Sequence, residues 1–194
     1  QKVVALTDLL AQMPTVVTVD LANLLPEPQR STLKAQRAPM PAGVLDFDEL
    51  LAAAPAGYLE SGRVIQPDDI ASYFHTGGTT GTPKLAPHTH FNEVAMAEII
   101  GLHGRYGPDD VLLCGLPLFH VNGVMVSGLA AFHHGAQVLL PGPQGYRNPT
   151  LIKDFWRLVE RYRVSSFSGV PTIYAALLQI PNEGIDVSTL RFAL

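Results

Sequence analysis

The chain carries one stretch that combines glycines, threonines and a lysine, and it reads Tyr73-Phe74-His75-Thr76-Gly77-Gly78-Thr79-Thr80-Gly81-Thr82-Pro83-Lys84. Glycine allows the backbone to approach a ligand closely, and threonine hydroxyls and a lysine ammonium group can contact anions. Consecutive backbone N–H groups in such a loop can form a concave anion site. The stretch therefore predicts a loop that holds the phosphates of a nucleotide, and a flexible surface turn is the alternative.

The spacing of these residues excludes the two commonest phosphate-binding motifs. In the Walker loop a lysine directly follows a glycine, whereas Thr82 and Pro83 separate Gly81 from Lys84. The dinucleotide-binding pattern needs a residue between its first two glycines, but the first two glycines of this stretch are adjacent. The stretch instead resembles the phosphate loop of the adenylate-forming superfamily, which includes acyl-CoA synthetases, aryl-CoA ligases and peptide-synthetase adenylation domains.

The match to that family's loop runs from Thr76 through Lys84, and its one departure is Leu85, where the family usually has glycine. The resemblance implies that the phosphates are bound by Thr76, Gly77, Gly78, Thr79, Thr80, Gly81, Thr82 and Lys84.

Strand and helix patterns alternate along the chain from residue 69 onward. The loop is expected to join the two strands of a β-hairpin, and Thr89 is the expected N-cap of the helix that follows. Repeated β-α-β units predict an α/β fold, in which helices flank a layered, largely parallel sheet and the phosphate loop lies in the hairpin. The expected strands are 70–75, 84–88, 111–116, 136–140 and 164–170, and the expected helices are 91–103, 121–133, 151–162 after a Thr150 N-cap, and one from Pro171 onward.

The helix expected at residues 151–162 has the clearest periodicity in the chain. Its apolar residues recur at helical spacing and predict one stripe that faces a core: Leu151, Ile152, Phe155, Leu158, Val159 and Tyr162.

The chain is expected to divide into two parts. Residues 1–68 form a partial N-terminal segment with a proline-rich surface connection at 26–43. Within this segment we expect helical character at 1–12, a strand at 15–19 and a helix at 46–54. Residues 69–194 form a nucleotide- and acyl-binding subdomain, truncated at its C-terminal end. The chain begins at Gln1 rather than methionine, and we expect an internal fragment of a longer protein.

Composition narrows the class of protein further. The 194 residues are 47% hydrophobic and 15% charged, which is typical of a buried core and not of a disordered segment. A net charge of −4 without a basic block argues against nucleic acid as a partner. The one cysteine, Cys114, lies in an apolar run, so we expect a buried, inert thiol and a cytoplasmic location. Prolines and glycines interrupt the uncharged stretch between Asp110 and Arg147, so no transmembrane segment is expected.

A second group of residues follows the strand expected at 111–116. The segment 116–123 resembles the family's acyl-pocket segment, and Ser168-Gly169-Val170-Pro171-Thr172 resembles the turn that walls the same pocket. The resemblance implies an acyl pocket formed by His120, Asn122, Gly123 and Val170; a histidine satisfied within a loop is the alternative. Small residues near Gly123 can either leave room for an acyl chain or allow close helix packing.

His120 also bears on the substrate. Amino-acid adenylation domains typically have an aspartate at its place to pair with the substrate amine, and a buried ammonium group without a counter-charge is costly. We therefore expect a carboxylic acid without an α-amine.

The other histidines are expected not to bind a metal. His133 and His134 are adjacent and are expected to point apart, and His88 and His90 lack the additional ligands of a structural zinc site. No G-x-S-x-G elbow of a serine hydrolase is present.

The resemblance implies an ATP-dependent carboxylic acid–CoA ligase acting on a fatty or aryl acid. ATP, Mg²⁺ and coenzyme A are the implied cofactors, and an acyl-adenylate is the implied intermediate. The family's later adenine, ribose and catalytic-lysine motifs are absent, so no catalytic residue is assigned and the fragment alone is expected to be inactive. A non-catalytic nucleotide- or acyl-binding module and a purely structural role for the loop are the alternatives, and the oligomeric state stays open.

Overall fold

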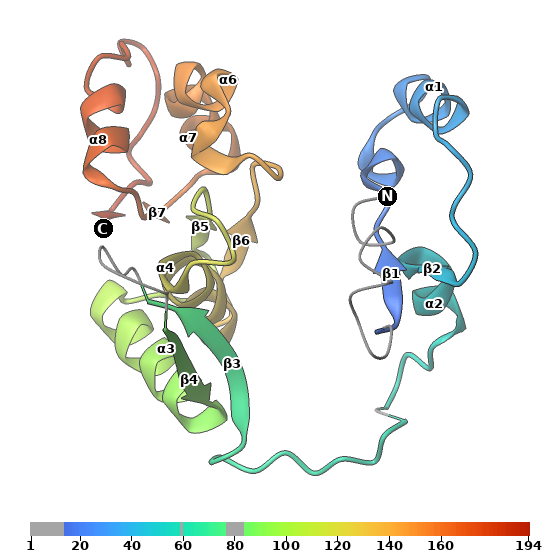
Figure 1. The fold of residues 1–194 in the computed structure, drawn as a ribbon. Helices are drawn as coiled ribbons and strands as arrows, with labels where there is room; N and C mark the ends of the chain where they lie inside the picture. Colours follow the sequence, from blue (N-terminus) through green and yellow to red (C-terminus); the bar gives the residue numbers. More distant parts are fainter. Residues whose placement is uncertain (1–13, 59, 77–83) are drawn as a thin grey trace. The chain divides into compact units, whose positions relative to one another are not determined.

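The computed structural model of the chain describes residues 14–58, 60–76 and 84–194 (Figure 1). The chain divides into two units, 1–64 and 65–194. Within the described ranges, no helix is long and apolar enough to cross a bilayer.

The first unit contains a small two-stranded parallel sheet. Strand β1 (Val16–Thr18) pairs with β2 (Val44–Asp46), which confirms the strand expected at 15–19. The 3₁₀-helix η2 (Leu21–Leu24) follows β1, and α2 (Phe47–Ala53) follows β2 because the Asp46 carboxylate accepts hydrogen bonds from the first turn of the helix. The segment 26–43 includes a helix, α1 (Gln29–Ala35), none of whose residues is buried. The helical character expected at 1–12 lies outside the described residues.

The second unit begins with the predicted hairpin. Strands β3 (Ile70–His75) and β4 (Leu85–Thr89) pair antiparallel, and α3 (His90–Gly104) follows without a break. Thr89 caps α3 as predicted, in a reciprocal capping box with Asn92. The helix ends where Arg105 adopts a left-handed conformation with φ 50°.

A four-stranded parallel sheet organises the rest of this unit. Its strand order is β6-β5-β7-β8, so the predicted parallel sheet is confirmed. The strands expected at 111–116, 136–140 and 164–170 are shorter in the structure. The four strands are β5 (Val111–Leu113), β6 (Gln137–Leu139), β7 (Ser166–Phe167) and β8 (Phe192–Ala193).

Side chains on the two faces of β5 enter separate hydrophobic cores. Successive residues of a strand point to opposite faces. Leu113 packs with Phe155 and Val159 of α7 (Phe155–Tyr162), whereas Leu112 packs with Ala130 and Ala131 of α5 (Ala130–His133). Helices therefore cover both faces of the sheet, as the sequence predicts.

Two predicted helices differ from their expected form. The helix at 121–133 is continuous, but a π-helical segment η3 (Met125–Leu129) separates α4 (Val121–Val124) from α5. The helix at 151–162 is broken at Asp154 into α6 (Pro149–Lys153) and α7.

The predicted Thr150 N-cap is wrong. The cap is Asn148, whose side-chain oxygen accepts a hydrogen bond from the Thr150 N–H at 3.0 Å. Pro149 occupies the first helical position, where its fixed φ suits a helix and its missing N–H is not needed. The predicted stripe is confirmed at Leu151, Phe155 and Val159, but Tyr162 at its end is 45% exposed. Pro171 begins α8 (Pro171–Leu177) as expected.

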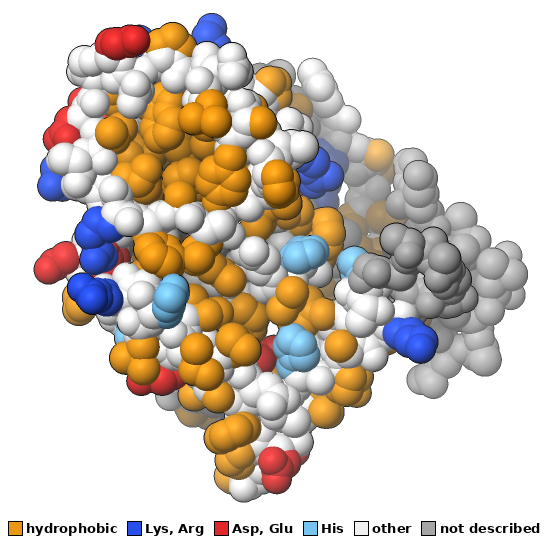
Figure 2. Space-filling model, turned by 90° about the vertical axis from the view of Figure 1, so that its left-hand side faces the viewer, with side chains coloured by type: hydrophobic (Ala, Val, Ile, Leu, Met, Phe, Trp, Pro, Cys, Tyr) orange, Lys and Arg blue, Asp and Glu red, His pale blue; other side chains and the backbone are white. Residues whose placement is uncertain are grey.

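Helix α3 is apolar around most of its circumference. Ala97 is buried, whereas Phe91, Ile99 and Leu102 are each at least 60% exposed. Hydrophobic side chains gather on the face of the molecule that Figure 2 shows, over α3 and α8. A helix that is apolar on all sides is typical of one that is covered on all sides, so this surface is suited to packing against further protein.

An ion pair joins two loops that lead into the sheet. Asp110 precedes β5 and contacts the guanidinium of Arg191, which precedes β8. Burial raises the pKa of Asp110, but hydrogen bonds with the Ser165 hydroxyl, Arg191 and the Gly107 N–H, together with the charge of Arg191, outweigh it. The pKa of Asp110 therefore lies below its ordinary value of 3.8.

This lowered pKa predicts an acid-sensitive contribution to stability. The folded protein binds the Asp110 proton less tightly than the unfolded chain does, so the stabilisation is present above about pH 4 and is lost as the pH falls through the lowered pKa. Asp110→Asn should therefore lower the free energy of unfolding at about pH 7, and the deficit should shrink towards about pH 3. Urea unfolding of both proteins at the two pH values measures this, and an equal deficit at both would contradict it.

Candidate functional site

The β3–β4 hairpin holds together the two ends of the predicted phosphate loop. The Thr76 N–H donates to the Lys84 carbonyl oxygen at 2.8 Å, and the Thr76 hydroxyl donates to the same oxygen at 3.3 Å. The remaining predicted phosphate-binding residues, 77–82, lie outside the described residues. The structure thus brings Thr76 and Lys84 together, and phosphate binding by the loop stays a prediction.

The predicted acyl-pocket segment forms the start of α4. His120 is the N-cap of this helix, and its Nδ1 accepts a hydrogen bond from the Asn122 N–H at 3.2 Å. An imidazole that accepts at Nδ1 carries its proton on Nε2 in the neutral form, so the exposed ring keeps one N–H to donate. His120 therefore caps a helix, and its ring is exposed.

Gly123 is needed for close packing at this turn. A Cβ at this position would lie 2.5 Å from the Pro117 carbonyl oxygen, a backbone atom that has little freedom to move. Ala130 and Ala131, farther along the same helical run, are fully buried in the core beside β5. Ala130 and Ala131 therefore serve helix packing, and an acyl-pocket role for Gly123 stays a prediction.

Two contacts bring separate strand ends to one place. The Ser168 hydroxyl, just beyond β7, donates to the Asn122 side-chain oxygen at 3.0 Å. The rings of His75 and Phe119 are stacked, with centroids 6.4 Å apart. The end of β3, the loop after β5 and the turn after β7 thus meet, and ligands of α/β sheets bind beyond such carboxyl ends. Val170, the half-exposed N-cap of α8, lies two residues after Ser168.

Tyr174 fixes the turn that carries Val170. Its hydroxyl accepts a hydrogen bond from the Gly169 N–H at 3.1 Å and donates to the Leu194 carbonyl oxygen. Burial raises the pKa of Tyr174, against the opposing effect of the Gly169 hydrogen bond, so the hydroxyl stays protonated at neutral pH. Ser168 and Tyr174 were not among the predicted site residues, although Ser168 lies within the turn motif that suggested Val170.

Cys114 is confirmed as a buried thiol. Its sulfur donates to the Gly123 carbonyl oxygen at 3.5 Å. Burial raises the pKa of this thiol, and a hydrogen bond with Ser127 only partly opposes the effect. A thiol with a raised pKa is a poor nucleophile at neutral pH, so we assign Cys114 a packing role.

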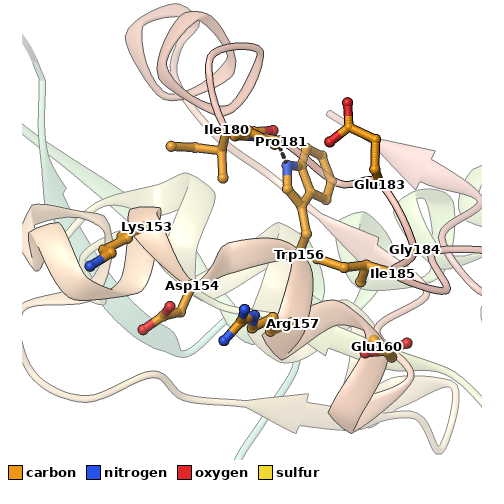
Figure 3. Close-up of a pocket in the computed structure, with 10 residues that line it drawn as sticks. All are labelled: Lys153, Asp154, Trp156, Arg157, Glu160, Ile180, Pro181, Glu183, Gly184 and Ile185. Carbon is orange, nitrogen blue, oxygen red and sulfur yellow. Dashed lines mark hydrogen bonds between the residues drawn. The ribbon is translucent and has the colours of Figure 1, made fainter.

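A hollow of about 900 Å³ lies elsewhere on the second unit, between α6, α7 and the segment after α8 (Figure 3). Trp156 stands at its centre, and its indole N–H donates to the Ile180 carbonyl oxygen at 3.0 Å. Charged side chains line much of the hollow, whereas small-molecule sites are mostly apolar. It contains none of the predicted site residues, and the strand ends remain the candidate site.

The chain belongs to the AMP-binding enzyme family, whose model matches residues 2–194. The predicted resemblance to adenylate-forming enzymes is therefore confirmed. Marinolic acid–CoA ligase of Pseudoalteromonas sp. (strain SANK 73390) is 43% identical over 153 residues, which cover 76% of this chain and 23% of that protein. Sulfoacetate–CoA ligase of Cupriavidus necator is 37% identical over 117 residues, which cover 60% of this chain and 22% of that protein.

The fold agrees with this family. The crystal structure of the anthranilate CoA ligase AuaEII in complex with anthranoyl-AMP matches 99% of this chain and 37% of that chain, with a TM-score of 0.69 and 23% identity. The predicted α/β architecture is thereby confirmed. The chain spans less than a quarter of the length of the two curated relatives described above.

Proposed function

We propose that this chain is part of an ATP-dependent carboxylic acid–CoA ligase that forms AMP. The observation that carries the proposal is the family match over residues 2–194, together with relatives named as CoA ligases. The contact of His75, at the end of the hairpin strand, with Phe119, beside His120, supports it, as does the hydrogen bond between Ser168 and Asn122.

In the proposed reaction, a carboxylate oxygen attacks the α-phosphorus of ATP. The bond between the α-phosphorus and its bridging oxygen breaks, and pyrophosphate leaves. Thr76, Lys84 and the loop between them would hold the β- and γ-phosphates and stabilise the charge on the leaving group. Mg²⁺ bound with ATP would neutralise part of that charge. The thiol of coenzyme A then attacks the acyl carbon, loses its proton and displaces AMP.

The acyl group is proposed to lie against His120, Asn122, Gly123 and Val170. His120 offers an N–H donor there and, unlike an aspartate, carries no negative charge to pair with an amine. We therefore propose a fatty or aryl carboxylic acid without an α-amine as the substrate. The chain alone is proposed to be inactive, and the buried free thiol of Cys114 supports a reducing, cytoplasmic location.

The proposal is tested by measuring AMP formation with the complete gene product that carries this chain. ATP, Mg²⁺ and coenzyme A are supplied with a panel of aliphatic, aryl and amino acids. AMP release that depends on a fatty or aryl acid, and not on amino acids, is the expected result. A folded protein that binds ATP but releases no AMP with any acid of the panel would favour the non-catalytic binding module. Preference for amino acids would overturn the role assigned to His120.

A further inference from the structure

Three side chains with metal-binding atoms converge between α3 and the end of α5, and none of them is among the predicted site residues. The Glu98 Oε2 atom lies 3.0 Å from the Nε2 atom of His133 and 3.3 Å from the Nε2 atom of His134. All three ligand atoms lie within 4.8 Å of one another. The expectation that the two histidines point apart is therefore wrong.

The end of α5 explains how adjacent histidines can face one carboxylate. His133 is the last residue of the helix, and His134 leaves it with φ −98° and ψ 11°. Gly135 then turns the chain with a positive φ of 74°. The two rings lie edge to face, with centroids 5.2 Å apart and an interplanar angle of 80°. Their nitrogens reach the same point because the backbone between them is no longer helical.

The neighbouring helix leaves space for the His134 ring. A Cβ at Gly101 of α3 would lie 1.9 Å from the His134 Cδ2 atom, so the absence of a side chain at Gly101 allows the ring to lie against the helix. The His134 Nε2 atom is buried, and its contact with Glu98 lacks hydrogen-bond geometry. A buried polar atom without a hydrogen bond is costly, and a metal–nitrogen bond would satisfy it.

We propose that Glu98, His133 and His134 bind a divalent transition-metal ion, with Zn²⁺ as the chemical match. Imidazole nitrogens and a carboxylate oxygen are ordinary zinc ligands, and bonds of about 2.0–2.1 Å in a tetrahedron place ligand atoms about 3.3 Å apart. The two distances to the Glu98 carboxylate oxygen approach this spacing. Rotation of the half-exposed His133 ring would bring the Nε2 atoms of the two histidines to the same spacing. Water completes the coordination at the exposed side of the cluster.

The bound ion would join α3 to α5. Helix α3 continues directly from strand β4 of the hairpin, and α5 is one of the helices that cover the parallel sheet. The ion would therefore hold the helix after the hairpin against the parallel-sheet layer. The ligands of this site, two imidazoles and one carboxylate, also distinguish it from a site for the Mg²⁺ that accompanies ATP, because Mg²⁺ prefers oxygen ligands. The inference is independent of the proposed function.

The test is a titration of the metal-free chain with Co²⁺, followed by its visible absorption, and with Zn²⁺, followed by calorimetry. The wild-type chain should bind one ion with an absorption spectrum typical of four-coordinate Co²⁺. Glu98→Gln and His133→Gln should each lower the affinity by at least about tenfold. His103→Gln is the matched control, since it removes an imidazole of α3 outside the cluster, and it should leave binding unchanged.

Thermal unfolding gives a second readout. Zn²⁺ should raise the melting temperature of the wild-type chain and of His103→Gln, but not that of Glu98→Gln. Circular dichroism checks that each variant is folded; His133→Gln changes an exposed side chain and leaves the packed His134 ring in place. Absence of saturable binding by the folded wild-type chain would overturn the proposal. Equal affinity in all variants would also overturn it and assign the three residues to an ion pair alone.

Discussion

Replacing Lys84 with alanine should lower the rate of acid-dependent AMP formation by the complete gene product by about 100-fold, the effect of removing one preorganised donor to developing charge. The proposed reaction moves negative charge onto pyrophosphate, and the Lys84 ammonium group is the cation assigned to that charge. The loss should appear mainly in the chemical step. Single-turnover measurement of acyl-adenylate formation at saturating ATP isolates that step.

The hairpin makes this substitution a clean test of the side chain. The backbone carbonyl of Lys84 accepts the hydrogen bonds from Thr76, and alanine keeps that carbonyl. The Lys84 side chain is exposed, so its removal leaves no cavity. Lys153→Ala, an exposed lysine at the end of α6, is the matched control and should retain full activity. Undiminished activity and ATP affinity in Lys84→Ala would assign the loop a purely structural role.

Replacing Phe155 with alanine should lower the free energy of unfolding by about 3–5 kcal/mol, as for other fully buried aromatic residues. The Phe155 side chain has no exposed surface, and its ring packs edge to face against Trp156 and Phe167, with centroid distances of 5.1 and 4.9 Å. The substitution removes these contacts and leaves a cavity between α7 and the sheet. Urea unfolding followed by fluorescence measures the loss.

Tyr162→Ala is the control on the same helix, because Tyr162 is 45% exposed. It should cost less than about 1 kcal/mol, as most surface substitutions do. If Phe155→Ala does not fold, Phe155→Leu provides a milder change that keeps most of the buried volume and should cost about 1.5 kcal/mol or less. Equal effects at Phe155 and Tyr162 would contradict the packing described here.

The sequence predicted those elements whose signals are local. The hairpin and its helix follow from the glycine loop and the Thr89 cap, and the face of α7 follows from apolar spacing. Helix α1 was not predicted because none of its residues is buried, so no apolar stripe reveals it. Asparagine and threonine are both common N-cap residues, so Asn148 and Thr150 were both candidates. The Pro149 between them could have identified Asn148, since proline favours the first helical position.

The parts of the site that were missed depend on contacts between distant segments. Ser168 reaches Asn122 across 46 residues of sequence, and only the order of the strands places them together. The Glu98–His133–His134 cluster was missed for a different reason. Adjacent residues of a regular helix or strand diverge, and only the exact end of α5 makes the two imidazoles converge.

The strand order of the second unit has a further consequence for the entropy of its chain. Pairing β3 with β4 closes the segment between Thr76 and Lys84, which are 8 residues apart, whereas pairing β5 with β7 joins residues 54 apart. Closing the longer loop directly costs about 1.7 kcal/mol more, because each doubling of loop length adds about 0.6 kcal/mol. The phosphate side of the candidate site is thus assembled from nearby residues at low entropic cost, and the acyl side depends on bringing distant residues together.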